Sequence, residues 1–205
     1  MNVLRTACSR CLRPVAFCVC AGLRPVENLT RVVIVQHPRE ARLAICSAWL
    51  TRIALARAEI HRGYDFTNHG RVRELARLPG AALLYPGDLA RPARDFANQP
   101  PPVLFVIDGT WLQSEKMLRA NPFLSALARL EVASAEPSGY AGLRREPAPH
   151  CLSTLEAVAC ALGDLEGDAA RFLPMRAAFR QAVEKQLACS QDGRRSPRHR
   201  RPRLS

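Results

Sequence analysis

The stretch Val103-Leu104-Phe105-Val106-Ile107-Asp108-Gly109-Thr110-Trp111 decides what kind of fold this chain can form. Its first five residues are an unbroken apolar run, with prolines before it and a glycine soon after it. Such a run is typical of a strand that is buried on both faces of a parallel sheet. The segment after Trp111 has the pattern of a helix, so Asp108 is predicted to lie at the carboxyl end of a strand.

Two interpretations of the tetrapeptide Asp108-Gly109-Thr110-Trp111 follow from this position. Ligands bind at the carboxyl edge of open α/β sheets, so a carboxylate, a glycine, a hydroxyl and an indole gathered there suggest a site. Alternatively, Asp108 caps the next helix and Trp111 packs in the core. These four residues by themselves leave both interpretations open.

The rest of the chain alternates between strand and helix patterns, which predicts an α/β domain with a largely parallel sheet flanked by helices. Further strands are expected at Arg31–Gln36 and Ala81–Tyr85, with a short one at Leu130–Ala133. The expected helices run from Glu40 to about Ala58, from Trp111 to about Leu130 with a break at Asn121-Pro122, from Ser153 to Leu162, and from Asp168 to Leu187.

Four of the eight cysteines are clustered as Cys8-x-x-Cys11 and Cys18-x-Cys20 near the N-terminus. Four thiolates in two close pairs can surround Zn²⁺ tetrahedrally, and binding would fold a segment with few apolar residues. The alternative is a redox pair, which the Cys-x-Cys half fits poorly. Because four protein ligands leave no open coordination position, we expect a structural zinc. The other cysteines are scattered and are expected to be small core or surface residues.

The chain is strongly basic, with a formal net charge of +12, which indicates a polyanionic partner such as nucleic acid. Part of this charge lies in a C-terminal segment of arginine, proline, serine and histidine that includes Arg194 and Arg195. Such a composition predicts a disordered arm that binds RNA phosphates, or a solubilising tail without a ligand. The expected divisions are a zinc module at 1–28, a catalytic domain at 29–189 and a basic tail at 190–205.

No apolar run approaches the roughly 20 residues that a membrane-spanning helix needs. The N-terminus carries Arg5, Arg10 and Arg13 among its cysteines and has no apolar segment typical of a signal peptide. The sequence therefore predicts a cytoplasmic protein without a membrane partner.

The order of short motifs along the chain resembles that of the DTW-domain proteins, from Cys8 to about Leu162. Besides the cysteine pairs, the motifs are Gln36-His37-Pro38-Arg39-Glu40, Tyr85-Pro86-Gly87, Asp108-Gly109-Thr110-Trp111, Leu143-Arg144-Arg145-Glu146-Pro147 and Leu152-Ser153-Thr154-Leu155-Glu156-Ala157. One departure is Cys46-Ser47, which stands where the family often has Asn-Thr or Gly-Thr. Ser47 keeps a small hydroxyl there, whereas Cys46 does not match.

This resemblance implies a fold related to the SPOUT methyltransferases, with a C-terminal trefoil knot that forms a pocket for S-adenosylmethionine. It also implies an enzyme that transfers the 3-amino-3-carboxypropyl group of S-adenosylmethionine to N3 of a tRNA uridine, giving acp³U. A homodimer is possible, as in many SPOUT enzymes. Two other functions stay open: a SPOUT-like RNA methyltransferase, and a non-catalytic RNA-binding zinc protein.

Transfer to N3 requires that the N3 proton be removed, and a carboxylate within hydrogen-bond reach can accept it. We expect Asp108 to be this base, with Thr110 and Trp111 in the same catalytic loop. Glu146 and Glu156 are rival carboxylates. Glu156 lies three residues after Ser153, the spacing of a helix capping box, so a structural role is favoured for it.

The resemblance and the strand ends together imply which residues contact the cofactor and the RNA. A guanidinium suits a carboxylate or a phosphate, and a helix N-terminus favours an anion, although a solvated loop and plain helix capping would give the same patterns. His37 could equally be a structural hydrogen-bonding residue. The expected cofactor contacts are Tyr85, Pro86, Gly87, Asp108, Gly109, Arg144, Leu152, Ser153 and Thr154, and the expected substrate contacts are His37, Glu40, Arg145, Arg194 and Arg195.

Overall fold

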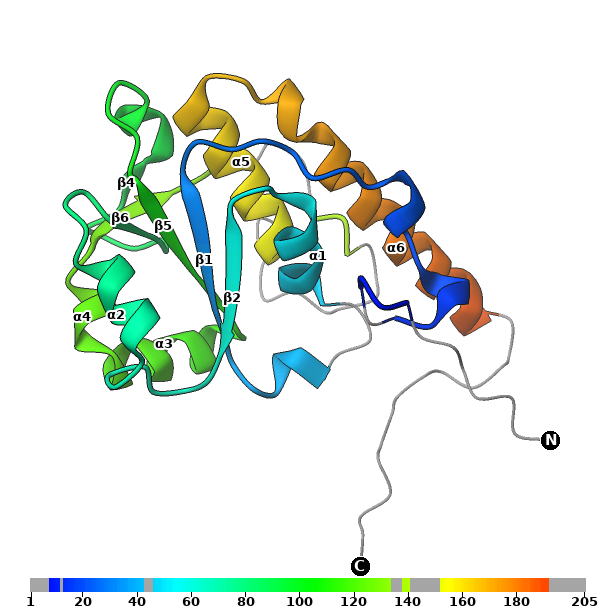
Figure 1. Ribbon diagram of the computed structural model, residues 1–205, viewed down its shortest axis with the longest axis horizontal. Helices are drawn as coiled ribbons and strands as arrows, with labels where there is room; N and C mark the ends of the chain where they lie inside the picture. The colour runs from blue at the N-terminus through cyan, green and yellow to red at the C-terminus, as the bar shows by residue number, and fades with distance from the viewer. Residues whose placement is uncertain (1–7, 12, 43–45, 134–137, 141–151, 192–205) are drawn as a thin grey trace, which may run out of the picture.

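The computed structural model in Figure 1 shows an α/β domain built on one twisted parallel sheet, and it describes residues 8–11, 13–42, 46–133, 138–140 and 152–191. The described strands form a six-stranded sheet in the order β2-β1-β5-β3-β6-β4, with every neighbouring pair parallel. The strands are β1 (Arg31–Gln36), β2 (Ala58–Arg62), β3 (Ala82–Leu84), β4 (Arg91–Pro92), β5 (Val103–Asp108) and β6 (Ala128–Glu131).

Helices cover both faces of this sheet (Figure 1). One face carries α1 (Ser47–Ala54), α5 (Thr154–Glu166) and α6 (Leu173–Gln191), and the other carries α2 (Gly70–Ala76), α3 (Trp111–Ala120) and α4 (Pro122–Ser125). Short 3₁₀ turns complete the described structure at Val15–Phe17, Cys20–Gly22, Glu40–Arg42, Ala93–Phe96 and Ala170–Phe172. The prediction of a largely parallel sheet flanked by helices is therefore confirmed.

The central strands are buried on both faces, which explains their unbroken apolar sequences. In β1, Val32 and Ile34 join the core beneath α1, α5 and α6, whereas Val33 and Val35 join the core beneath α2, α3 and α4. All four side chains are 0 % exposed. Full burial of one such side chain is worth about 1.5–3 kcal/mol, so β1 and its neighbour β5 anchor both layers.

Several expected helix boundaries are wrong. The α-helix expected from Glu40 begins at Ser47, and the one expected from Asp168 begins at Leu173. The helix expected to reach Ala58 ends at Ala54, because Ala58 begins β2. The helix expected to reach Leu130 is replaced by α3, α4 and then β6, which already starts at Ala128. Strands β2 and β4 and helix α2 were not predicted. Strand β2 has the burial pattern Biiie and carries charged residues, so it lacks the apolar signal of a central strand.

The cysteine-rich N-terminal segment packs on the same side of the sheet as α1 and α6. Cys11, Val19, Cys20 and Leu23 belong to the core that also contains α5 and α6 side chains. The ammonium group of Lys185, in α6, donates a hydrogen bond of 2.8 Å to the carbonyl of Cys18. The zinc module expected at 1–28 thus shares its hydrophobic core with the rest of the domain.

Helix α6 runs to Gln191, two residues into the segment that was expected to be the tail. Residues 192–205, with Arg194 and Arg195, lie outside the described residues. Within the part of the chain that the structure describes, none of the helices is long and apolar enough to cross a membrane.

A carboxylate on β2 joins the edge of the sheet to helix α2. Glu59 accepts hydrogen bonds from Arg31 on β1 at 2.8 Å and from Arg71 on α2 at 2.9 Å. Burial opposes ionisation of this carboxyl, but the bonds and positive charge of Arg71, with smaller contributions from His61 and Arg31, lower the pKa of Glu59 to about 2.

We predict that Glu59→Gln lowers the free energy of unfolding at pH 7 by about 1–3 kcal/mol, because the lowered pKa stabilises the folded state. This contribution is present above the ordinary pKa of 4.5 and is lost as the pH falls from there toward 2. Urea unfolding at a series of pH values measures it. Glu74→Gln is the control, since Glu74 also pairs with Arg71 but its side chain is 66 % exposed. Equal effects of the two substitutions would contradict the prediction.

Candidate functional site

A cavity of about 300 Å³ opens at the carboxyl ends of β3, β5 and β6, beside the first turns of α3 and α5. This is the sheet edge where ligands bind in open α/β folds, and the volume is at the lower end of the range for small-molecule sites. The described residues that line it are Leu84, Tyr85, Pro86, Val106, Ile107, Gly109, Trp111, Ser114, Glu131, Val132, Leu152, Thr154 and Ala157.

Asp108, the last residue of β5, lies next to this cavity and is tied to two other elements. Its Oδ2 accepts a hydrogen bond of 2.8 Å from Nε2 of Gln36 on β1. Its Oδ1 accepts a hydrogen bond of 2.6 Å from the hydroxyl of Thr154, the first residue of α5. Asp108 is only 7 % exposed, and of these two residues Thr154 lines the cavity while Asp108 does not.

Gln36 was not predicted as a site residue, although it holds the Asp108 carboxylate. Its Oε1 accepts a hydrogen bond of 3.3 Å from Nε of Arg62, so its NH₂ group is turned toward Asp108 and the sulfur of Cys46. Burial, together with the Asp108 carboxylate, raises the pKa of the Cys46 thiol. One signal was available in the sequence, because Gln36 and Asp108 each follow an apolar run that predicts a strand. In the structure these two residues lie opposite each other on the neighbouring strands β1 and β5.

The second interpretation of the tetrapeptide 108–111, a helix cap at Asp108 and a core tryptophan, is wrong in both parts. The cap of α3 is Thr110, whose hydroxyl accepts from the amide of Gln113 while its own amide donates to the Gln113 side chain. Asp108 does not cap this helix. Trp111 does not pack in the core: it is 43 % exposed, lines the cavity and meets Tyr85 edge to face, with ring centroids 5.8 Å apart.

The favoured structural role of Glu156 is confirmed. Ser153 and Glu156 form a capping box at the start of α5. The Glu156 carboxylate, 3 % exposed, also accepts hydrogen bonds from the amide of Gly139 at 2.7 Å and from the hydroxyl of Ser138 at 3.1 Å. Glu156 therefore joins Ser138 and Gly139 to the start of α5, and it is not among the described residues that line the cavity.

Several other expected site residues do not line the cavity. Gly87 has a φ of 146°, a backbone conformation that favours glycine. The hydroxyl of Ser153 accepts a hydrogen bond from the amide of Glu156 and so caps α5. His37 accepts from the amide of Arg39 through Nδ1, and Glu40 is buried in the following turn. Arg144, Arg145 and the rival carboxylate Glu146 lie outside the described residues.

The cavity also contains residues that sequence reasoning missed. Glu131 ends β6 and is the one charged side chain among the described lining residues. Ser114, Val132 and Ala157 complete the wall. Because β6 is short and its start was predicted two residues late, Glu131 was expected inside the strand and not at its end.

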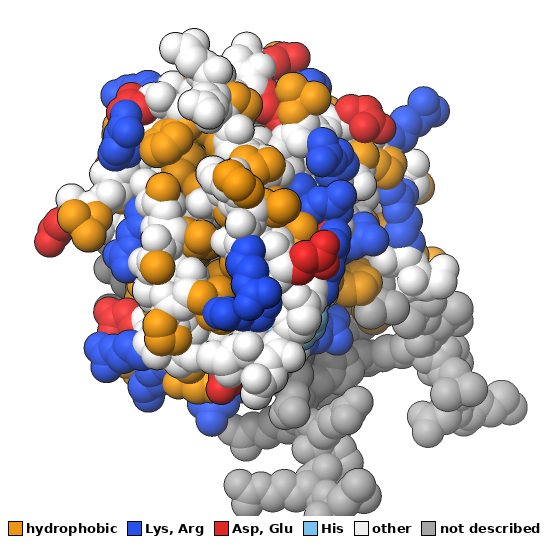
Figure 2. Space-filling model, turned by 60° about the vertical axis from the view of Figure 1, so that its left-hand side comes forward, with side chains coloured by type: hydrophobic (Ala, Val, Ile, Leu, Met, Phe, Trp, Pro, Cys, Tyr) orange, Lys and Arg blue, Asp and Glu red, His pale blue; other side chains and the backbone are white. Residues whose placement is uncertain are grey.

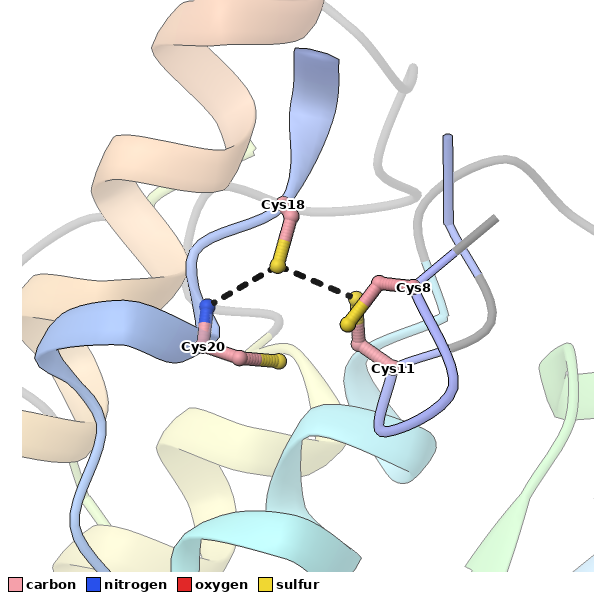
Figure 3. A group of neighbouring side chains, drawn as sticks. All are labelled: Cys8, Cys11, Cys18 and Cys20. Atoms are coloured by element: carbon pink, nitrogen blue, oxygen red, sulfur yellow. Dashed lines mark hydrogen bonds between the residues drawn. The ribbon is translucent and has the colours of Figure 1, made fainter. Parts of the chain in front are cut away.

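The four N-terminal cysteines converge on one point (Figure 3). All four sulfur atoms lie within 4.8 Å of one another, and those of Cys11 and Cys18 are 3.8 Å apart. The amide of Cys20 donates a hydrogen bond of 3.3 Å to the sulfur of Cys18. This group could hold a metal ion.

Buried positive charge beside the cysteines supports that interpretation. Arg13 is 7 % exposed, and its three guanidinium nitrogen atoms have no hydrogen-bond partner. An unpaired buried charge is costly, so a counter-charge is expected nearby. Burial lowers the pKa of Arg13, while negative charge on Cys11, Cys18 and Cys20 would raise it. Four thiolates around a divalent ion carry a net charge of about −2, which Arg13 would offset.

The surface matches the basic composition. Figure 2 shows Lys and Arg side chains at many places on the visible face, with some Asp and Glu side chains between them and exposed apolar side chains toward the middle. Near the cavity, the guanidinium of Arg129 lies 5.7 Å from the ring centroid of Tyr85. A basic surface attracts a polyanionic molecule, and a largely apolar cavity within that surface can receive an uncharged group of the same molecule.

Fold and site together define a parallel α/β protein with a ligand cavity at the carboxyl edge of its sheet and a potential metal centre of four cysteines. The family model described as "DTW domain" matches residues 5–187. This chain belongs to the DTW-domain family.

Curated relatives carry names that describe an activity. Proteins named tRNA-uridine aminocarboxypropyltransferase 2 are 33 % identical over 170 residues in Drosophila melanogaster and 34 % identical over 172 residues in Mus musculus, each match covering 79 % of this chain. The chain spans 67 % of the fly protein and 57 % of the mouse protein. tRNA-uridine aminocarboxypropyltransferase A of Arabidopsis thaliana is 28 % identical, over 80 % of this chain and 74 % of its own length. No solved structure matches the chain.

We predict that Gln36→Leu lowers the free energy of unfolding by about 1–3 kcal/mol, because it removes the hydrogen bond that the buried Gln36 amide donates to Oδ2 of Asp108 and the one that it accepts from Arg62. Urea unfolding at pH 7 measures the loss. Gln99→Leu, at an exposed position, is the matched control. A Gln36→Leu protein as stable as the control would show that the amide does not hold the carboxylate.

Proposed function

We propose that this protein transfers the 3-amino-3-carboxypropyl group of S-adenosylmethionine to N3 of a uridine in tRNA, forming acp³U. One observation carries the proposal: residues of three separate DTW-family motifs, Tyr85, Trp111 and Thr154, line a single cavity. The names of the relatives and the basic surface support tRNA as the substrate class.

S-adenosylmethionine supplies an electrophilic carbon next to a sulfonium. The work left to the protein is to aim that carbon at N3 and to accept the N3 proton. In the reaction the N3–C bond forms, the C–S bond breaks with its electron pair going to sulfur, and the N3 proton passes to the protein. Asp108 is the proposed acceptor, and the hydrogen bonds that it accepts from Gln36 and Thr154 fix its orientation.

The cavity fits a nucleoside-type ligand in chemical terms. Its walls are largely apolar, and they include the indole of Trp111, the phenol of Tyr85 and the carboxylate of Glu131. We assign Tyr85, Pro86, Gly109, Leu152 and Thr154 to S-adenosylmethionine binding, with Thr110 and Trp111 in the catalytic loop. Gly87, Ser153 and Arg144 complete the cofactor proposal, and His37, Glu40, Arg145, Arg194 and Arg195 the RNA contacts.

The finer structural expectations belong to the same proposal. They are a SPOUT-like fold with a C-terminal trefoil knot, a homodimer and a cytoplasmic location. The parallel sheet and the strand-end cavity are compatible with the first of these.

We also propose that Cys8, Cys11, Cys18 and Cys20 hold a structural Zn²⁺. Tetrathiolate ligation is the usual closed zinc site, and the unpartnered Arg13 guanidinium supplies the compensating charge. With all four positions occupied by protein, this metal would stabilise the fold and take no part in the transfer.

The transfer proposal is tested by incubating the protein with unmodified tRNA and S-adenosylmethionine, then measuring nucleosides by mass spectrometry. We expect acp³U with the wild-type protein and a rate about 10²–10⁴-fold lower with Asp108→Asn, which keeps the shape but not the charge. Asp95→Asn is the control, because Asp95 pairs with exposed Arg91. Methylated nucleosides alone would indicate a methyltransferase, and tRNA binding without any product a non-catalytic RNA-binding protein.

The zinc proposal predicts that Cys18→Ser, or removal of metal by a chelator, lowers the melting temperature of the whole domain. The reason is that Cys11 and Cys20 are part of the same core as α1, α5 and α6. Calorimetry measures the shift, and a colorimetric dye counts the released metal. Cys160→Ser, a half-buried cysteine outside the cluster, is the control. Full-length protein that is metal-free and equally stable would contradict the proposal.

A further inference from the structure

The Asp108 carboxylate and the Thr154 hydroxyl form a pair in which one member faces the cavity and the other does not. Thr154 lines the cavity, whereas Asp108 is 7 % exposed. The two are joined by a hydrogen bond of 2.6 Å from Oγ1 of Thr154 to Oδ1 of Asp108. A ligand in the cavity thus meets the hydroxyl before it meets the carboxylate.

The direction of this hydrogen bond determines what Thr154 can offer to a ligand. A hydroxyl has one proton to donate and two lone pairs. A carboxylate has no proton, so the hydroxyl must donate its own proton to Asp108. The oxygen then has only lone pairs left, and it can accept a hydrogen bond from a donor in the cavity.

The carboxylate is held in place for this arrangement. Gln36 donates to the second oxygen of Asp108 at 2.8 Å, and Arg62 fixes the orientation of the Gln36 amide. Thr154 is also the first residue of α5, directly after the Ser153 cap, so its backbone is fixed by the capping box. Both members of the pair are therefore preorganised.

We propose that Oγ1 of Thr154 accepts the N3–H of the acceptor uridine and relays its proton to Asp108. As the N3–C bond forms and the C–S bond breaks, the N3 proton moves to Oγ1 while the hydroxyl proton moves to Oδ1 of Asp108. Thr154 ends neutral, Asp108 ends protonated, and the sulfur takes the electron pair. The proposal rests on the transfer reaction proposed above, and it assigns the Thr154 hydroxyl to the uridine rather than to the methionyl carboxylate.

The same geometry selects uridine against cytidine. N3 of uridine carries a proton, whereas N3 of cytidine carries a lone pair that would face the lone pairs of Oγ1. A site that accepts a hydrogen bond from the correct base is left unpaired by the wrong one, which is an effective basis for discrimination. Thr154 is thus a specificity-determining residue as well as a catalytic one.

The test compares Thr154→Val, which keeps the branched shape, with Thr154→Ser, which keeps the hydroxyl. We expect kcat for acp³U formation to fall about 100-fold in Thr154→Val and only a few-fold in Thr154→Ser, with little change in KM for tRNA. Thr67→Val is the matched control, because the Thr67 hydroxyl also bonds a carboxylate, Asp65, at 2.6 Å but at an exposed site. Melting temperatures show whether each variant is folded.

A second measurement separates proton transfer from a merely structural role. tRNA transcribed with 5-fluorouridine has a more acidic N3–H, so less help is needed to remove the proton. We expect this substrate to restore the rate of Thr154→Val by a larger factor than it raises the rate of wild type. Equal factors, or a Thr154→Val enzyme as fast as wild type, would overturn the relay. Absence of acp³U with wild-type protein would instead overturn the transfer reaction and the relay with it.

Discussion

Strands β1 and β5 pair in parallel over their whole length, from Arg31 opposite Val103 to Gln36 opposite Asp108. Their apolar residues separate the two hydrophobic cores, and Val32 to Val35 are fully buried. This pairing also brings two polar side chains to the same end of the sheet, where the Gln36 amide donates to the Asp108 carboxylate. The packing of both cores and the geometry of the site therefore depend on the register between β1 and β5. A slip of β1 by one residue would turn its side chains to the opposite faces of the sheet and would separate Gln36 from Asp108.

From Gln36 a continuous set of contacts leads to the cysteine-rich segment. Arg62 bonds the Gln36 amide and lies 5.4 Å from the ring centroid of Trp49, whose indole donates to the carbonyl of Arg10. Arg10 in turn donates to the carbonyl of Cys20. The segment that could hold a metal is thus part of the scaffold behind Asp108, so a metal ion bound there would stabilise that scaffold.

The charges are distributed in two zones that suit different tasks. Arginines and lysines lie on the surface, where solvent screens them and where they can contact phosphates without distinguishing sequence. The cavity has largely apolar walls, and the buried Asp108 beside it interacts more strongly with its partners than it would in water. In the function proposed above, RNA binding would depend on the exterior and proton transfer on the strand ends.

The sequence by itself determined the parallel α/β class, the strands β1, β3 and β5, the cap of α5 and the grouping of the cysteines, because each is encoded in local composition or spacing. It missed β2, α2 and β4 and placed β6 two residues late, because these elements are short or half-exposed and carry no clear periodicity. Only the tertiary structure decided that Gln36 supports Asp108, that the Thr154 hydroxyl bonds Asp108, and that Trp111 is exposed. These relations join residues far apart in the chain, and hydrogen bonds between distant strand and helix ends depend on how the sheet is ordered, which no local pattern records.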